Sequence, residues 1–296
     1  MSATSELDSV HYSDWLALFG FFPESEALRY AQLPNENPAD ASARLSEKLQ
    51  RAREVVSKIT GRASIKPKVR KLGQEHAERV ARLQAEPTFN EHLIGMKSSD
   101  FSWVELRKLK AFQPFLNLEY VDRLVESAPE PTDQEGTVAF CLPLRSERLP
   151  AEVLTGFNPN SNTFVISSGN LDLRVVGNFA SEDQASGRKL VGFAYDFGLP
   201  QISVAEYKGG FFVKNGYHRA FALLKKGHEY LPCLTVSTDT FQATGGQLPG
   251  FFPVDLILSD QAPLLADFLS GAALKIPRRR FRATVSVHAE LQMVGM

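Results

Sequence analysis

In the second half of the chain, apolar and polar residues alternate in a pattern typical of β-strands. The stretch 201–207 alternates in this way, and two glycines predict a hairpin turn from it into a second strand at 211–213. Apolar residues at helical spacing over 217–226, followed by Gly227, predict a helix with a glycine C-cap. A further strand is expected at 230–236. The order strand, hairpin, strand, helix, strand indicates a compact α+β unit.

The first half has apolar residues spaced for helices. Ser42 is a candidate N-cap for a helix that continues to about residue 59, and a second helix is predicted over 69–83. The same spacing predicts a helix over 99–112 and a shorter one over 118–125. These helices would make the N-terminal region predominantly α-helical.

A proline-rich and acidic stretch at 128–136 has no apolar periodicity and is typical of a linker. Strand patterning follows it, with a buried strand expected at 138–142, a hairpin at 163–176 and a half-buried strand at 284–291. The sequence therefore predicts an α+β protein with a helical region at 1–128, a linker at 129–136 and a β-rich domain at 137–296.

Composition indicates an ordinary globular protein, with 43% hydrophobic and 23% charged residues and a net charge of −1. Only two cysteines, Cys141 and Cys233, are present, so neither a disulfide framework nor a cysteine-based zinc site is expected. No apolar run is long enough for a membrane span, and residues 1–8 lack the pattern of a secretory signal. We therefore expect a cytoplasmic protein with no membrane partner.

Charge is distributed unevenly along the chain. Residues 1–40 hold one basic residue against seven acidic ones, whereas residues 41–83 hold twelve basic residues against four acidic ones. The basic helices at 41–83 could bind nucleic acid. Alternatively, their basic face is solvated and docks on the acidic N-terminal arm, and the lack of interleaved aromatic residues favours this interpretation.

The start of the helix at 217–226 carries two basic residues, His218 and Arg219, in its first turn. The N-terminus of a helix has a partial positive charge and unpaired N–H donors, so cations are unfavourable there. A bound phosphate or carboxylate would reverse the sign of this interaction, and Gly216 would let such a ligand approach the backbone. The alternative is that both side chains point into solvent or pair with a nearby acid.

The segments 200–204, 215–220 and 231–234, with Gly227 between them, resemble the ParB/sulfiredoxin-like superfamily over roughly 40 residues. The resemblance implies a mixed β-sheet domain with helices. It also implies a phosphate-bearing ligand, above all a nucleotide, at the helix start. The phosphate-binding residues carried over by position are Asn215, Gly216, Tyr217, His218 and Arg219.

Two departures from this family narrow the function that it implies. Sulfiredoxins have their reactive cysteine where this chain has Tyr217, so repair of peroxiredoxins is not expected. ParB proteins carry an upstream arginine-bearing box and a downstream helix-turn-helix, and neither is recognisable in this chain. DNA segregation by the ParB route is therefore not expected either.

Residues for catalysis are poorly marked in the sequence. The six histidines have no metal-ligand spacing, and neither a nucleophile elbow nor a phosphate-binding P-loop is present. No metal site is predicted, although Mg²⁺ could arrive with a nucleotide. The candidate catalytic residues are His218, Glu206 and Asp196. A second anion contact, or simply the exposed start of a strand, is predicted at Arg278, Arg279, Arg280 and Arg282.

Three functions follow from these patterns. The leading one is binding of a nucleotide or another phosphate ligand, with its hydrolysis or phosphoryl transfer left open. The second is a DNA- or RNA-binding module or nuclease of the ParB-like class, in which the helices at 41–83 extend the contact. The third is a non-catalytic scaffold that retains the same fold.

Overall fold

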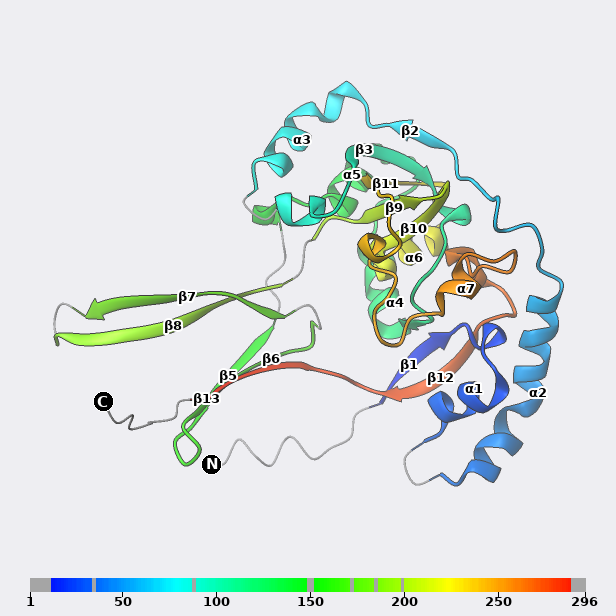
Figure 1. Cartoon of the computed structure of the whole chain (residues 1–296), viewed down its shortest axis with the longest axis horizontal. Helices are drawn as coiled ribbons and strands as arrows, with labels where there is room; N and C mark the ends of the chain where they lie inside the picture. Colours follow the sequence, from blue (N-terminus) through cyan, green and yellow to red (C-terminus); the bar gives the residue numbers. More distant parts are fainter. Residues whose placement is uncertain are drawn as a thin grey trace. The chain divides into compact units, whose positions relative to one another are not determined.

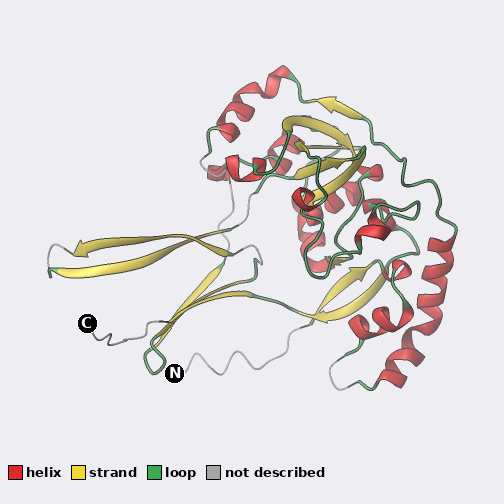
Figure 2. Ribbon diagram, viewed as in Figure 1, coloured by secondary structure: helices red, strands yellow, loops and turns green. Residues whose placement is uncertain are grey.

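The computed structural model describes residues 12–33, 36–86, 89–147, 152–170, 173–183, 186–197 and 200–288 of the chain (Figure 1). Helices and strands occur in similar measure (Figure 2), which confirms the predicted α+β class. The chain divides into two compact units. One comprises Met1–Glu147 and Pro200–Arg279, and the other comprises Arg148–Leu199 and Arg280–Met296.

The larger unit contains a five-stranded sheet with the strand order β10-β9-β11-β3-β2. Its only parallel pair is β9 with β11, and helix α6 (Tyr217–Lys226) lies between these strands in the sequence, as in a βαβ crossover. The strands are β2 (Val69–Lys71), β3 (Ser98–Glu105), β9 (Ser203–Tyr207), β10 (Gly210–Asn215) and β11 (Tyr230–Ser237). The predicted order strand, hairpin, strand, helix, strand is confirmed in this sheet.

A smaller sheet of the same unit has the order β12-β1-β4 and is antiparallel throughout. It consists of β1 (Tyr12–Ala17), β4 (Phe115–Asn117) and β12 (Leu274–Arg279). The long helix α2 packs beside this sheet (Figure 1). The remaining α-helices of the unit are α1 (Glu24–Ala31), α2 (Pro38–Ser57), α3 (Ala77–Gln84), α4 (Leu118–Ser127), α5 (Gln134–Cys141) and α7 (Val254–Ile257).

One hydrophobic core joins the two sheets of the larger unit. It is rich in aromatic rings, and Phe112 stacks on Phe212 with ring centroids 5.0 Å apart. All members of this core come from the larger unit. We therefore expect that its stability does not depend on the smaller unit.

The smaller unit has two separate sheets. A three-stranded sheet has the order β13-β6-β5, from β5 (Val153–Asn158), β6 (Thr163–Ser168) and β13 (Ala283–His288). A two-stranded ribbon pairs β7 (Arg174–Asp183) with β8 (Arg188–Asp196). Among its described hydrophobic side chains, only Ile166 and Leu173 are buried.

Several predicted elements differ from those in the structure. The predicted helix at 99–112 is largely strand β3, because residues 98–105 pair along their whole length with β11. The predicted helix at 69–83 is split into β2 and α3. The predicted strand at 138–142 lies mostly within helix α5, whose N-cap Asp133 accepts a hydrogen bond from the Gly136 amide.

The predicted hairpin at 163–176 is also wrong, since β6 pairs with β5 and β13 whereas β7 pairs with β8. The part of the predicted strand at 284–291 that lies beyond residue 288 falls outside the described residues.

The structure divides the chain at different positions from those expected. The segment 128–136 packs on the C-terminal end of α6, where the Lys226 ammonium donates to the Ala128 carbonyl at 2.5 Å and pairs with Glu130 at 3.0 Å. A ring nitrogen of His228 lies 3.0 Å from the Pro129 carbonyl. These contacts hold the segment within the larger unit, and the boundaries between the two units lie near residues 147, 200 and 279.

Candidate ligand-binding site

Helix α6 begins where the sequence predicts, and its start is built into the fold. Gly216 has a φ of 87°, and a Cβ at this position would lie 2.7 Å from the Ile202 side chain. Glycine is therefore required both by the left-handed backbone and by this close approach. The Asn215 amide donates to the Gln201 carbonyl at 3.0 Å, which ties the turn to the segment before β9.

Tyr217 points into the core. Its hydroxyl accepts a hydrogen bond of 2.6 Å from the Phe112 amide, and burial raises the pKa of this phenol. The Tyr217 side chain thus satisfies a buried backbone donor.

His218 is neutral at physiological pH. Its ring is enclosed by protein atoms although the residue as a whole is partly exposed, and this desolvation lowers the pKa of His218 to about 4. The Nε2 atom accepts a hydrogen bond of 3.1 Å from the Asn117 amide, a role that only an unprotonated nitrogen can fill. His218 therefore does not supply the positive charge that the sequence predicted for an anion contact.

Arg219 is the cation at this helix start, and its guanidinium donates hydrogen bonds to backbone carbonyls. Nη1 donates to the Phe140 carbonyl at 3.2 Å and Nη2 donates to the Pro200 carbonyl. The guanidinium thereby links the end of α5 to the segment before β9. These carbonyl contacts differ from each explanation that the sequence offered, which were a bound anion, a solvent-facing side chain and an ion pair with a nearby acid.

The other predicted site residues are spread through the chain. Glu206 lies on β9, while Asp196 ends β8 in the smaller unit. Arg278 lies over the Phe115 ring, 4.2 Å from its centroid, and burial lowers the pKa of Arg278. Arg279 is the last residue of β12, and Arg280 and Arg282 belong to the smaller unit. Among the described residues, no group of three His, Cys, Asp or Glu side chains is placed to hold a metal ion.

The basic segment 41–83 is partly neutralised by the acidic segment before it. Arg44 pairs with Glu36 at 2.9 Å, and Arg53 pairs with Glu24 at 2.6 Å. The hydrogen bond from Arg44 is the main cause of the lowered pKa of Glu36. These pairs support the interpretation that the basic helix docks on the acidic N-terminal segment.

Lys110, a residue that the sequence gave no reason to select, is a nearly fully buried lysine. Lys110 is only 2% exposed, and its backbone is fixed against β10 by hydrogen bonds with Phe211 and Val213. The ammonium lies 5.5 Å from the centroid of the Phe212 ring, and no described residue offers it a hydrogen bond or ion pair. Burial lowers the pKa of Lys110, and the charge of Asp260 partly opposes that shift.

Lys110 lines a pocket of about 230 Å³ beside the β9–β10 turn. The pocket combines basic and apolar side chains, and it is lined by Ala63, Lys110, Tyr207, Lys208, Gly210, Phe212 and Leu258. Lys66 approaches from outside the pocket and packs against Gly209 at the turn. Within the described part of the chain, no carboxylate forms an ion pair with Lys66, Lys110 or Lys208. We call these three residues the lysine cluster.

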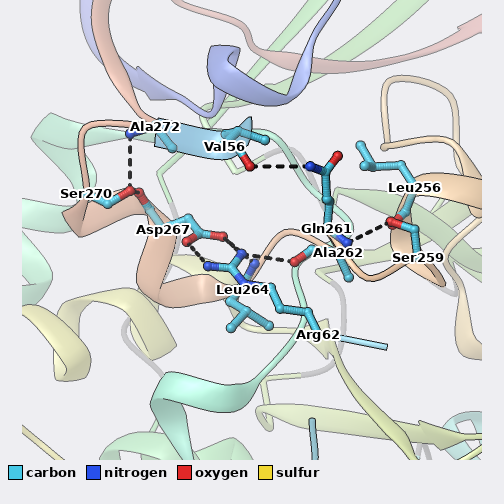
Figure 3. Close-up of polar contacts among 10 residues, drawn as sticks. All are labelled: Val56, Arg62, Leu256, Ser259, Gln261, Ala262, Leu264, Asp267, Ser270 and Ala272. Atoms are coloured by element: carbon cyan, nitrogen blue, oxygen red, sulfur yellow. Dashed lines mark hydrogen bonds and ion pairs between the residues drawn. The ribbon is translucent and has the colours of Figure 1, made fainter. Parts of the chain in front are cut away.

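Figure 3 shows a network of polar contacts around Arg62, the residue that precedes Ala63 of the pocket lining. The guanidinium of Arg62 forms two hydrogen bonds with Asp267, with Nη1–Oδ2 at 2.5 Å and Nη2–Oδ1 at 2.8 Å. Nη1 also donates to the Ala262 carbonyl at 3.1 Å, and the Ala63 amide donates to Asp260 at 3.3 Å. Segments about 200 residues apart in the sequence are held together in this way.

The lysine cluster is a product of tertiary structure. Lys110 follows Leu109 in a stretch whose spacing suggested a helix, and Lys208 resembles an ordinary charged turn residue. They meet because the backbone of Lys110 bridges β10 and the segment near Leu264. No local sequence signal identifies this arrangement.

Comparisons with protein-family models, with curated proteins and with solved structures found no match to this chain. None of the helices in the described ranges is both long and apolar enough to cross a lipid bilayer.

Proposed function

We propose that this protein binds a small phosphate-bearing ligand, with a nucleotide as the leading candidate, and that Lys110 holds its anionic group. The carrying observation is Lys110, a residue only 2% exposed that lines a pocket and whose ammonium has no hydrogen-bond or ion-pair partner among the described residues. Desolvation without a hydrogen-bond partner disfavours the charged form of a lysine, in accord with the lowered pKa of Lys110. A phosphate oxygen in the pocket would supply the missing charge and the missing hydrogen-bond acceptor.

The lysine cluster suits a ligand with more than one negative charge. Lys208 lines the same pocket as Lys110, and the side chain of Lys66 lies beside Gly209 at the adjacent turn. Lysine acts as a point charge toward phosphate and does not require the bidentate geometry of arginine. Apolar side chains of Phe212 and Leu258 offer surface to an uncharged part of the ligand.

This proposal keeps the ligand class implied by the ParB/sulfiredoxin-like resemblance but moves the anion away from the start of α6. The side chains of Tyr217, His218 and Arg219 are engaged by the protein's own backbone. The geometry identifies groups that could hold a ligand and no group that acts on it. The proposal is therefore confined to binding.

Isothermal titration calorimetry with inorganic pyrophosphate and with nucleoside mono-, di- and triphosphates tests the proposal. Lys110→Met keeps the length of the side chain and removes its charge, and Lys48→Met, on the exposed face of α2, is the matched control. We expect Lys110→Met to weaken binding about 10- to 100-fold, the scale of a charged hydrogen bond, and Lys48→Met to have no effect. Equal affinity in wild type and Lys110→Met would contradict the proposal.

The same titration over a range of salt concentrations separates the remaining alternatives. A single pocket predicts a shallow dependence of affinity on salt, whereas a nucleic-acid interface with many phosphate contacts predicts a steep one. A steep slope with an oligonucleotide, and no binding of pyrophosphate or nucleotides, would favour a nucleic-acid-binding module. Absence of binding to all of these would favour a scaffold.

A further inference from the structure

The ribbon formed by β7 and β8 exposes an unusual amount of apolar surface. Val191, Phe193 and Tyr195 alternate along β8 and therefore share one face, with exposed fractions of 76%, 42% and 41%. On β7, Val175 lies opposite Tyr195 and is 43% exposed. An isolated two-stranded ribbon is only marginally stable in water, so this ribbon is expected to gain from a partner.

The two outer edges of the ribbon differ in regularity. The pairing register shifts between Val175 and Gly177, which places a β-bulge in β7, whereas β8 runs without interruption. Bulges are among the devices that protect edge strands from pairing with other chains. No other strand in the described structure pairs with β8, so its outer edge is the regular and unprotected one.

The sequence of β8 is complementary to itself. If two copies pair antiparallel about Gly192, Arg188 of one copy lies opposite Asp196 of the other, and the reverse contact occurs at the other end. Val191 then lies opposite Phe193 of the second copy, an aromatic and β-branched pair of the kind that stabilises sheets. A two-fold arrangement makes every such contact twice.

The corresponding pairing through β7 is less favourable. A symmetric antiparallel pair about the centre of β7 would place Val175 opposite Glu182 of the second copy. Charge and side-chain pairing therefore favour β8 over β7 as the self-pairing edge, and the position of the bulge in β7 favours the same edge.

We propose that β8 is a self-association surface, at which a second copy of this chain pairs antiparallel about Gly192. The two ribbons then form one four-stranded sheet in the order β7-β8-β8-β7. The apolar stripes formed by Val191, Phe193 and Tyr195 of the two copies adjoin on one face of that sheet. Phe179 covers the opposite face of Gly192, where a Cβ would lie 2.2 Å from the Phe179 ring.

Sedimentation velocity of the full-length chain over a concentration series tests the proposal. The wild type is expected to show a reversible monomer–dimer equilibrium. Val191→Lys places a cation opposite Phe193 of the second copy and should raise the dimer dissociation constant at least about tenfold. Val176→Lys makes the same change at an exposed valine on β7, 51% exposed, and should leave the constant unchanged.

The register is tested by disulfide trapping. A mixture of Val191→Cys and Phe193→Cys chains should give an oxidised heterodimer, whereas Val191→Cys with Val176→Cys should not. The native Cys141 and Cys233 are buried and do not interfere. A wild type that stays monomeric at every concentration would overturn the proposal, as would dissociation of a dimer by Val176→Lys in place of Val191→Lys.

Discussion

Arg62 and Asp267 are 205 residues apart in the sequence and meet through two parallel hydrogen bonds (Figure 3). Their side chains are 16% and 6% exposed, so the pair is largely withdrawn from water. Asp267 also accepts a hydrogen bond of 2.8 Å from the Leu264 amide, next to the backbone that bridges Lys110. The pair thereby connects the wall of the pocket at Ala63 to the segment that positions Lys110.

Removal of one member of this pair should destabilise the protein. Arg62→Met leaves the Asp267 carboxylate buried without its cation, and we expect a loss of roughly 3 kcal/mol in the free energy of unfolding. Urea unfolding followed by circular dichroism measures this loss. The control is Arg51→Met, since Arg51 pairs with Glu47 on the exposed surface of α2 and should cost less than about 0.5 kcal/mol. Equal effects of the two substitutions would show that the buried pair has no special structural role.

The hydroxyl of Tyr217 provides a second test of the start of α6. Tyr217→Phe removes the acceptor of the Phe112 amide and keeps the ring in the core. A buried backbone donor without a partner costs about 1–3 kcal/mol, and we expect a decrease of that size in unfolding free energy. Tyr12→Phe is the control, because this tyrosine is 39% exposed at the start of β1. An unchanged stability of Tyr217→Phe would mean that another group satisfies the Phe112 amide.

The unit from β9 to β11 was predictable from sequence because its signals are local. Alternation defines its strands, and Gly216 and Gly227 mark the two ends of α6 with left-handed backbone at both positions. The strand at 98–105 was not predictable in the same way, since its pairing partner β11 lies more than 120 residues further along the chain. A five-residue apolar run such as 138–142 fits a strand or a buried helix equally well. The tertiary packing around α5 determines that this run is helical.

The contacts of the candidate site could be predicted from the sequence even less well than the strands. The sequence located the start of α6 correctly, but the partners of His218 and Arg219 are carbonyls and amides of distant segments. Backbone partners carry no sequence signature. The desolvation of Lys110 is likewise a result of packing, because nothing in its neighbourhood in the sequence distinguishes it from a surface lysine.

The lowered pKa of His218 gives a prediction for the pH dependence of stability. The pKa of about 4 in the folded state lies below the ordinary histidine pKa of 6.5, so the unfolded state binds more protons between these values. Stability should therefore decrease as the pH falls from 6.5 toward 4, with His218 contributing at most about 3 kcal/mol of the decrease. His218→Gln retains an acceptor and cannot titrate, so its unfolding free energy should depend less on pH in this interval. His288→Gln, at an exposed position on β13, should follow the wild-type curve. Parallel curves for wild type and His218→Gln would contradict the assigned neutral state.

A comparison of Arg219→Ala with Lys110→Met distinguishes the two positions at which an anion could bind. Arg219 holds the Phe140 and Pro200 carbonyls, so Arg219→Ala should lower the free energy of unfolding by about 2–3 kcal/mol. Its folded fraction should bind pyrophosphate with wild-type affinity. Lys110→Met removes a desolvated charge and should leave the unfolding free energy unchanged or raise it, while binding weakens about 10- to 100-fold. Urea titrations give the first quantity, and calorimetric titration under conditions where both variants are folded gives the second. The reverse outcome, with weakened binding in Arg219→Ala and normal binding in Lys110→Met, would contradict the assignment of the anion to Lys110 and favour the start of α6, because removing the charge that holds the anion should weaken binding most.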